Sequence, residues 1–189
     1  MPRLVLASAS PRRRDLLAQI GRPPDLIAPA DIDESERDGE LPRPLAERLA
    51  QQKAEVVRAR YPGDVVLAAD TVVAVGRRIL PKTEVREDAE ACLRLISGRA
   101  HRVFTGLAVA GPKDEMRVRL VETRVKVRRL TARAIDHYLD GGEWRGKAGG
   151  YGIQGAFGAH IVHLSGSYSA VVGLPLYQTE NCLSAAFGD

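Results

Sequence analysis

The sequence predicts a fold of the α/β or α+β class built on a mixed β-sheet, and three observations lead to this prediction. Segments with strand alternation and segments with helical periodicity follow one another in irregular order along the 189 residues. Two of the strand segments are long and expose arginines on one face, which favours a partly antiparallel sheet. The length suits one compact domain, or at most two small lobes, so we treat residues 1–189 as one unit.

The N-terminal residues predict a strand followed by a helix. Arg3–Ala7 alternates weakly like a strand, and the chain then turns into a helix over Pro11–Ile20. Ser10 suits the N-cap of this helix, Pro11 its first position and Gly21 its C-terminal cap.

A second strand, Leu26–Ala30, leads through an acidic segment, residues 31–40, into a long helix that Pro42 and Pro44 introduce. The apolar stripe of this helix consists of Leu45, Leu49, Val56 and the alanines between them.

The middle of the chain alternates strand and helix. Val65–Asp70 is typical of a buried strand, and Val72–Leu80 has the pattern of a hairpin that turns at Gly76. A helix follows over Arg86–Ser97 and stops at Gly98. Its apolar face is formed by Ala89, Leu93 and Ile96.

Two long strand patterns come next, Arg102–Ala110 and Met116–Leu130. The apolar phase of the second shifts near Leu120 and Val121, which predicts a β-bulge there. Thr131 then caps another helix.

A glycine-rich segment, residues 141–158, holds eight of the 18 glycines and cannot form a regular helix. It is either a flexible loop or a ligand cradle. A strand over His160–Leu164 and a last helix from about Leu174 complete the chain.

Two short motif matches within the glycine-rich segment are misleading. Gly141–Lys147 has the spacing of a P-loop, but Ala148 replaces the hydroxyl that would hold magnesium, and a helix precedes the motif instead of a strand. Gly150, Gly152 and Gly155 match the dinucleotide fingerprint, yet a strand follows them where that fingerprint needs a helix.

The composition excludes several other classes. Cys92 and Cys182 lie far apart and lack zinc-site spacing, so we expect two reduced thiols and a cytoplasmic protein. No apolar run approaches the roughly 18 residues of a membrane span, and we find no signal peptide. The net charge of +4 suits an anionic ligand without distinguishing a nucleotide from nucleic acid.

The junction of the first strand and helix carries the first candidate site, residues 8–14, with the sequence SASPRRR. Three arginines in the first helical turn oppose the positive end of the helix dipole, which costs several tenths of a kcal/mol each unless an anion binds. Backbone N–H groups, the hydroxyls of Ser8 and Ser10 and the guanidinium groups of Arg12 and Arg13 could together bind phosphate. The alternative is a solvated basic turn.

Asp70, with Thr71 beside it, is the second candidate. We expect Asp70 at the C-terminal tip of a buried strand, where open α/β sheets bind their ligands. A carboxylate there can hold magnesium or take a proton from a water molecule. The alternative is an aspartate that starts an ordinary turn.

Charged residues farther along the chain form the third candidate set. Lys53 follows Leu49 by four residues, so it lies on or beside the apolar stripe and either faces the sheet or reaches out of the helix edge into solvent. Glu34 lies in the acidic segment, and Lys82 follows the hairpin.

These pieces together resemble the Maf family of nucleoside triphosphate pyrophosphatases, also known as septum formation inhibitors. The resemblance extends along almost the whole chain, and its motifs occur in the family's order. They are LASASPRRRDLL at 6–17, Asp33 with Glu34, LAQQKA at 49–54, ADTV at 69–72, Ser97 with Gly98, KAGGYGIQG at 147–155 and GSYSAVVGLPL at 166–176. The KAGGYGIQG segment resembles the subgroup that acts on dTTP and UTP.

The resemblance implies a fold of the inosine triphosphatase type, with a twisted mixed sheet and flanking helices that form two lobes around a nucleotide cleft. It implies hydrolysis between the α and β phosphates with a divalent metal, Mg²⁺ or Mn²⁺, and a homodimer. It also implies that Asp70 is the proton acceptor and that Arg12, Thr71 and Gln154 act in base selectivity, and the other polar positions of the family's site match Ser10, Arg13, Glu34, Lys53 and Lys82. The negative charge of a triphosphate then leads us to expect Arg13, Lys53 and Lys82 as phosphate ligands, Ser10 at an outer phosphate, and Glu34 and Asp70 as metal ligands. The family often has proline after the lysine that Lys82 matches, whereas this chain has Thr83, so we expect the loop that carries Lys82 to lie differently.

Three alternative functions stay open. The same chemistry could act on 7-methyl-GTP or another purine triphosphate. A nucleic-acid-binding module could use the arginines, but aromatic residues make up only 5% of the chain and do not interleave with them. The third alternative is a regulator of cell division that acts through protein contacts.

Overall fold

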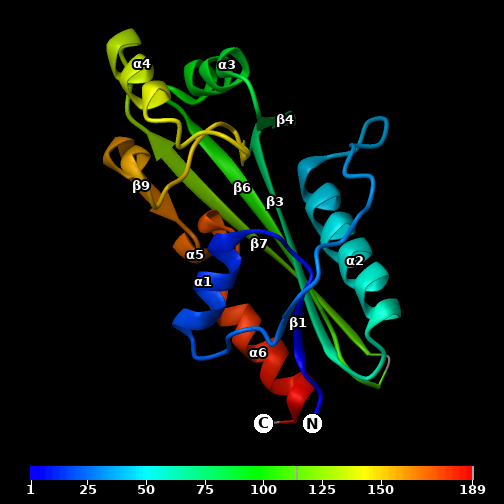
Figure 1. Cartoon of the computed structure of the whole chain (residues 1–189). Helices are drawn as coiled ribbons and strands as arrows, with labels where there is room; N and C mark the ends of the chain where they lie inside the picture. Colours follow the sequence, from blue (N-terminus) through cyan, green and yellow to red (C-terminus); the bar gives the residue numbers. More distant parts are fainter. Residues whose placement is uncertain (114, 189) are drawn as a thin grey trace.

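The computed structural model describes residues 1–113 and 115–188 (Figure 1). Within these residues, a seven-stranded mixed sheet has the order β2-β1-β3-β6-β7-β9, with β4 paired to β3, and β5 pairs with β8 in a separate ladder. The strands are β1 (Leu4–Leu6), β2 (Leu26–Ile27), β3 (Val65–Val75), β4 (Arg78–Leu80), β5 (Lys82–Thr83), β6 (Ala100–Ala110), β7 (Met116–Val127), β8 (Lys147–Ala148) and β9 (Ile161–Ser165). The helices are α1 (Pro11–Gln19), α2 (Pro42–Arg60), α3 (Arg86–Ile96), α4 (Ala132–Asp140), the 3₁₀ helix η1 (Ala156–His160), α5 (Tyr168–Val172) and α6 (Leu176–Phe187).

The predicted mixed sheet is confirmed. β1 pairs in parallel with β2 and β3, whereas β3, β6, β7 and β9 pair antiparallel with their neighbours in this order. The long strands β3, β6 and β7 run from the end that carries α1 and α6 to the end that carries α3 and α4 (Figure 1). These three strands therefore extend through the whole length of the molecule and contribute to both of its ends.

Helices cover the two faces of the sheet. α2 lies on one face, and α1, α3, α4 and α6 lie on the other (Figure 1). Even-numbered residues of β3 and β6, such as Ala68 and Ala108, pack toward α2. Odd-numbered residues, such as Leu67 and Leu107, belong to the larger core on the opposite face.

The buried stripe of α2 differs by one residue from the prediction. Val56 is 40% exposed, and the fully buried residue is Val57, which continues the four-residue spacing of Leu45, Leu49 and Lys53. Of the two positions that the sequence left open for Lys53, the structure has the inward one, since this side chain is buried. A lysine on the buried stripe needs an anionic partner. Because the stripe packs against the sheet, that partner has to come from the sheet or from a segment beside it.

Gly106 allows α2 to lie close to the sheet. It stands opposite Asp70 in the β3–β6 ladder, and a Cβ atom at this position would lie only 2.1 Å from the carbonyl oxygen of Ala46 on α2. Only glycine permits this approach. The short separation lets a side chain from α2 reach a side chain on β3.

The predicted end of the strand at Asp70 is wrong, because β3 continues through Asp70 and Thr71 to Val75. The backbone pairs with β6 without interruption from Val66 to Ala74, and this non-local ladder holds the polar residues in the strand. The hairpin predicted around Gly76 is confirmed by the pairing of Val75 with Arg78.

The predicted bulge at Leu120 and Val121 is also wrong. The β6–β7 register is regular from Ala110↔Met116 to Ala100↔Lys126. The apolar phase shifts because different layers cover the two halves of β7. Leu120 packs against the α2 side, whereas Val125 packs into the core on the opposite face.

Other elements agree with the predictions within a few residues. The α1 boundaries and the positive φ of Gly21 at its C-terminal end are confirmed, as is the Thr131 N-cap, which accepts a hydrogen bond from the Ala134 N–H. The predicted strand after residue 25 is only two residues long, and α5 precedes a last helix that starts at Leu176.

Across residues 1–113 and 115–188, no helix combines the length and the apolar character that crossing a membrane requires.

Candidate active site

The candidate site lies at a gap along one edge of β3. β1 pairs with this edge at Val65–Leu67, and β4 pairs with it at Val73–Val75, so neither strand covers Asp70 and Thr71. A cavity of about 290 Å³ lies against this gap. Asp70 is therefore a mid-strand residue of β3 that still lies just beyond the C-terminal end of β1.

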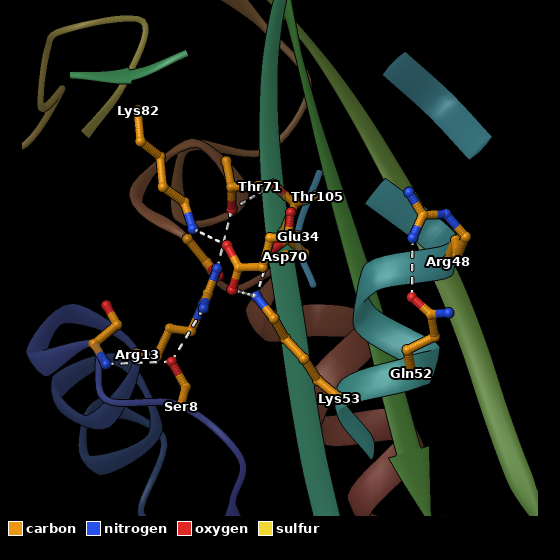
Figure 2. A network of polar contacts seen from close by, with 12 residues as sticks. Ser8, Arg13, Glu34, Arg48, Gln52, Lys53, Asp70, Thr71, Lys82 and Thr105 are labelled. Carbon is orange, nitrogen blue, oxygen red and sulfur yellow. Dashed lines mark hydrogen bonds and ion pairs between the residues drawn. The ribbon is translucent and has the colours of Figure 1, made fainter. Parts of the chain in front are cut away.

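The structure brings all ten candidate residues to this one cavity. They come from six separate segments of the chain, and Figure 2 shows most of them converging between α1 and α2. The ten are Ser8, Ser10, Arg12, Arg13, Glu34, Lys53, Asp70, Thr71, Lys82 and Gln154.

Two carboxylates share one ammonium group at the centre of the cavity. The Nζ atom of Lys53 lies 2.6 Å from Oδ1 of Asp70 and 2.6 Å from Oε1 of Glu34. Lys53 and Asp70 are only 6% and 3% exposed. Buried charges need such partners, because a single unpaired charge at this depth would be strongly destabilising.

Glu34 also pairs with a second lysine. Its Oε2 atom accepts a hydrogen bond from Lys82, whose side chain is half exposed at the cavity rim. Burial opposes ionisation of Glu34, but the hydrogen bonds and charges of Lys53 and Lys82 outweigh burial and lower the pKa of Glu34 to about 2. Glu34 is therefore a carboxylate throughout the neutral range.

Arg13 links three segments on the other side of the cavity. Its Nε atom donates to the Gly173 carbonyl at 2.9 Å, and its terminal nitrogens donate to Oγ of Ser8 at 3.0 Å and Oγ1 of Thr71 at 3.4 Å. Burial lowers the pKa of Arg13, an effect that the Asp70 carboxylate opposes. A guanidinium so placed is fixed in orientation before any ligand arrives.

Ser10 occupies the N-cap position of α1, as predicted, but its hydroxyl makes no capping hydrogen bond. Its own N–H donates to Oγ of Ser8 at 3.2 Å. The Ser10 hydroxyl lines the cavity at the helix N-terminus, where an anion is favoured.

Thr83 keeps Lys82 at the cavity despite the departure from the family pattern. Its hydroxyl is fully buried and donates to the carbonyls of Trp144 and Lys147, at 2.9 and 3.2 Å. The pairing of β5 with β8 joins the same segments. A proline at this position could not donate these hydrogen bonds. The threonine therefore attaches the Lys82 segment to the glycine-rich segment by contacts that the family's usual proline cannot make.

The glycine-rich segment forms one wall of the cavity, which favours the cradle over the flexible loop. Gly149 has a φ of 71°, and a Cβ atom there would lie 2.9 Å from the Val73 side chain. Lys147, which sequence reasoning missed as a separate site residue, also lines the cavity. Burial and the nearby charge of Arg12 lower the pKa of Lys147. Its only signal in the sequence was its place at the start of KAGGYGIQG.

His101 holds this wall from behind. Its Nε2 atom lies 2.7 Å from the hydroxyl of Tyr151, a residue that lines the cavity. His101 is only 2% exposed, and burial lowers its pKa to about 4. It is therefore a neutral residue that anchors Tyr151 through a hydrogen bond.

The buried His101 should make stability depend on pH. An unfolded histidine takes up a proton near pH 6.5, whereas the folded one resists protonation down to about pH 4, so stability falls as pH decreases through this window. We expect this residue to contribute a loss of about 2 kcal/mol in the free energy of unfolding between pH 7 and pH 5. Urea unfolding of the wild type and of His101→Gln at both pH values measures the difference. An equal loss in the two proteins would contradict this assignment.

Asp70 and Glu34 are the residues that could hold a divalent metal. Carboxylate oxygens suit Mg²⁺ and Mn²⁺, and Mg²⁺ commonly binds through one or two carboxylates plus substrate phosphates. The described part of the chain contains no group of three or more His, Cys, Asp or Glu residues that could hold an ion. Two carboxylates alone suit an ion that takes its remaining ligands from water or from a bound molecule.

Comparisons with known proteins agree with this geometry. The profile of the family described as Maf-like protein matches residues 3–186. A relative from Caulobacter vibrioides, named dTTP/UTP pyrophosphatase, is 61% identical over 183 residues, which cover 97% of this chain and 95% of the relative. A relative of the same name from Maricaulis maris is 59% identical over 186 residues, covering 97% and 88% of the two chains.

A solved structure supports the fold alone. The HAM1 protein from Coxiella burnetii superimposes with a TM-score of 0.53 at 16% sequence identity, covering 98% of this chain and all of the other. The expected mixed α/β fold is confirmed, and the HAM1 protein shares it.

Proposed function

This chain belongs to the Maf-like protein family, and from this premise we propose that it is a pyrophosphatase that hydrolyses dTTP and UTP to the nucleoside monophosphate and pyrophosphate. The observation that carries the proposal is the convergence of five cationic side chains and two carboxylates on one cavity. The cationic residues are Arg12, Arg13, Lys53, Lys82 and Lys147.

The charge of the cavity suits a triphosphate. A nucleoside triphosphate carries about four negative charges at neutral pH, and breaking the bond between the α and β phosphates places further charge on the departing pyrophosphate. Preorganised cations stabilise that charge without having to reorganise during the reaction. Arg13, Lys53 and Lys82 are the groups that we assign to this role.

The N-terminus of α1 is the proposed binding site for an outer phosphate. The Ser8 and Ser10 hydroxyls lie there beside the guanidinium of Arg13. Backbone N–H groups at the start of a helix add a favourable field for an anion. Arg13 is already oriented by Gly173, so little entropy is lost when phosphate binds.

Asp70 is the proposed general base. It is nearly buried, the β3–β6 ladder fixes its backbone, and before a ligand binds Lys53 holds its carboxylate through Oδ1. A carboxylate fixed in this way can accept a proton from a water molecule that attacks the phosphorus. When water attacks the α phosphorus, the bond from this phosphorus to the oxygen that bridges the α and β phosphates breaks. The nucleoside monophosphate keeps the oxygen of the water, and pyrophosphate leaves with the bridging oxygen.

A divalent metal, Mg²⁺ or Mn²⁺, completes the proposal. When bound, such an ion neutralises phosphate charge and lowers the pKa of water. Glu34 and Asp70 are the residues that would hold it. For the carboxylates to become available, Lys53 and Lys82 must give up contacts with them, and the phosphates are the partners that these ammonium groups would then take.

Gln154, Arg12 and Thr71 are the proposed determinants of base selectivity. The side-chain amide of Gln154 carries a donor and an acceptor, so it can pair with the O4 and N3–H edge of uracil or thymine. Cytosine presents the reversed pattern. Arg12 also lines the cavity, and its Nε atom donates to the Val172 carbonyl at 3.2 Å.

Three further expectations extend the proposal. Residues 1–189 would act as one catalytic unit, the protein would be cytoplasmic, and two copies would form a homodimer. Sedimentation of the purified chain tests the last of these.

A triphosphate panel tests the proposed function. We expect dTTP and UTP to release pyrophosphate at least about tenfold faster than CTP, GTP or 7-methyl-GTP, in the presence of Mg²⁺ or Mn²⁺. Pyrophosphate and phosphate are measured separately, so that cleavage at the terminal phosphate is recognised. If 7-methyl-GTP were the preferred substrate, the proposed base selectivity would be wrong, but the proposed pyrophosphatase reaction would stand. Absence of pyrophosphate release from every triphosphate would contradict the proposal.

A further inference from the structure

The segment that carries Glu34 lies between β2 and α2 and forms neither helix nor strand in the described residues. Glu34 nevertheless has to stay at the centre of the cavity. In the proposed reaction both lysines turn to the phosphates, so their contacts with Glu34 would not hold it there throughout. Another contact must position this segment.

Arg48, on the second turn of α2, makes that contact. Its Nε and one terminal nitrogen donate to the two carboxylate oxygens of Glu40, at 2.7 and 2.6 Å. The same terminal nitrogen donates to the Ser35 carbonyl at 3.0 Å. The third nitrogen donates to Oε1 of Gln52 at 2.9 Å, one turn farther along α2 (Figure 2).

This clamp, Arg48 with Glu40, is unusually well protected for a pair near the surface. The side chains of Arg48 and Glu40 are only 14% and 9% exposed. A bidentate and largely buried arginine–carboxylate pair has fixed geometry, unlike most surface ion pairs. The hydrogen bonds from Arg48 lower the pKa of Glu40 to about 2, so the pair stays charged in the neutral range.

The clamp holds the segment at two points that follow Glu34, the Ser35 carbonyl and the Glu40 carboxylate. Ser35 follows Glu34 directly, and its N–H and hydroxyl also donate to the Asp33 carboxylate, at 2.9 and 2.5 Å. At the other end, Glu40 accepts the N–H of Arg37 at 3.0 Å. One guanidinium on a rigid helix therefore fixes both ends of the short turn that begins next to Glu34.

We propose that Arg48, through Glu40 and the Ser35 carbonyl, is a positioning residue that holds Glu34 at the catalytic centre independently of the two lysines. The inference rests on the proposed function, because it concerns where Glu34 stands during hydrolysis. Arg48 does not line the cavity, so it acts through Glu34 and not on the substrate. Lys53 lies on the same helix, so the clamp ties Glu34 to the element that carries its partner.

Arg48→Met and Glu40→Gln test the proposal. We expect kcat for dTTP to fall about 10- to 100-fold in Arg48→Met, with KM changed less than about threefold, because the phosphate ligands stay in place. Hydrogen exchange of residues 31–40 should accelerate in both variants while exchange in β3 and β6 stays slow. Arg48→Lys keeps the charge but loses the bidentate geometry, and it should recover part of kcat. Glu40→Gln keeps the assay informative if Arg48→Met does not fold.

Arg94→Met is the matched control, since it removes an exposed ion pair with Glu90 on α3 by the same substitution. It should leave kcat, KM and exchange in residues 31–40 unchanged. The proposal is overturned if Arg48→Met and Glu40→Gln keep wild-type kcat, whether or not exchange accelerates, or if only KM rises. A wild-type protein without pyrophosphate release would instead overturn the proposed function, and exchange would still show whether the clamp orders the segment.

Discussion

Asp70→Asn is expected to lower kcat for dTTP and UTP about 10²- to 10⁴-fold, the range that general-base catalysis contributes. Asparagine has nearly the same shape as aspartate, and Lys53 retains Glu34 as a charged partner, so the fold should stay intact. The loss should appear in kcat, because the groups assigned to phosphate binding are unchanged. Steady-state pyrophosphate release and far-ultraviolet circular dichroism measure the two parts of this prediction.

Asp140→Asn is the matched control for Asp70→Asn. The Asp140 carboxylate is exposed at the end of α4, where it pairs with Arg86 outside the cavity. This variant should have wild-type kcat and KM. An Asp70→Asn protein that kept substantial turnover would remove Asp70 from the role of general base.

Lys53→Met is expected to lower both activity and stability. Without the ammonium group, Asp70 and Glu34 lose the cation that they share, and breaking a buried pair of this kind costs about 3 kcal/mol or more. Turnover should fall about 10²-fold or more, because a cation for the departing pyrophosphate is lost as well. Urea unfolding at pH 7 and the pyrophosphate assay measure the two effects.

The pH dependence of Lys53→Met follows from the same contacts. Lys53 is one of the two lysines that lower the pKa of Glu34 to about 2, so this pKa should rise in the variant. A carboxyl group with a lowered folded pKa contributes stability that is lost as pH falls from its ordinary pKa of 4.5 toward about 2, so the variant should lose less stability than the wild type between about pH 5 and about pH 3. An equal loss in the two proteins would contradict this electrostatic account.

A double variant tests whether the stability lost in Lys53→Met comes from the unpaired charge of the remaining carboxylates. Adding Asp70→Asn to Lys53→Met removes one of the carboxylates left without its partner, so stability at pH 7 should partly recover. Activity should stay lost, since both the base and a cation are missing. Recovery of activity together with stability would show that Lys53 serves only to hold the fold.

Local features of the fold could be predicted from the sequence, because neighbouring residues determine them. The start of α1 at Pro11, the hairpin at Gly76 and the Thr131 cap depend on residues within one turn of each other. Two features that depend on distant partners, the end of the strand at Asp70 and the bulge in β7, were predicted wrongly. Asp70 stays within β3 because β6 pairs with it, and β7 changes its apolar phase because different helices cover its two ends.

The same distinction applies to the candidate site. Each charged residue taken alone had an ordinary structural explanation, and only their convergence at the gap in the β3 edge separates a binding site from a solvated surface. The order of motifs along the chain indicated the family, but not the Arg48–Glu40 clamp or the lining position of Lys147. Those contacts join segments whose spacing in the sequence carries no periodic signal.

The central claim is that cations from distant segments and the Asp70 carboxylate meet on one polyphosphate. A crystal structure of the wild-type chain with the non-hydrolysable analogue α,β-imido-dTTP and Mg²⁺ tests it most directly. We predict phosphates in contact with Arg13, Lys53 and Lys82, Asp70 beside the α phosphate, and thymine at Gln154. A triphosphate bound elsewhere, with Lys53 still joining Asp70 to Glu34, would contradict the claim.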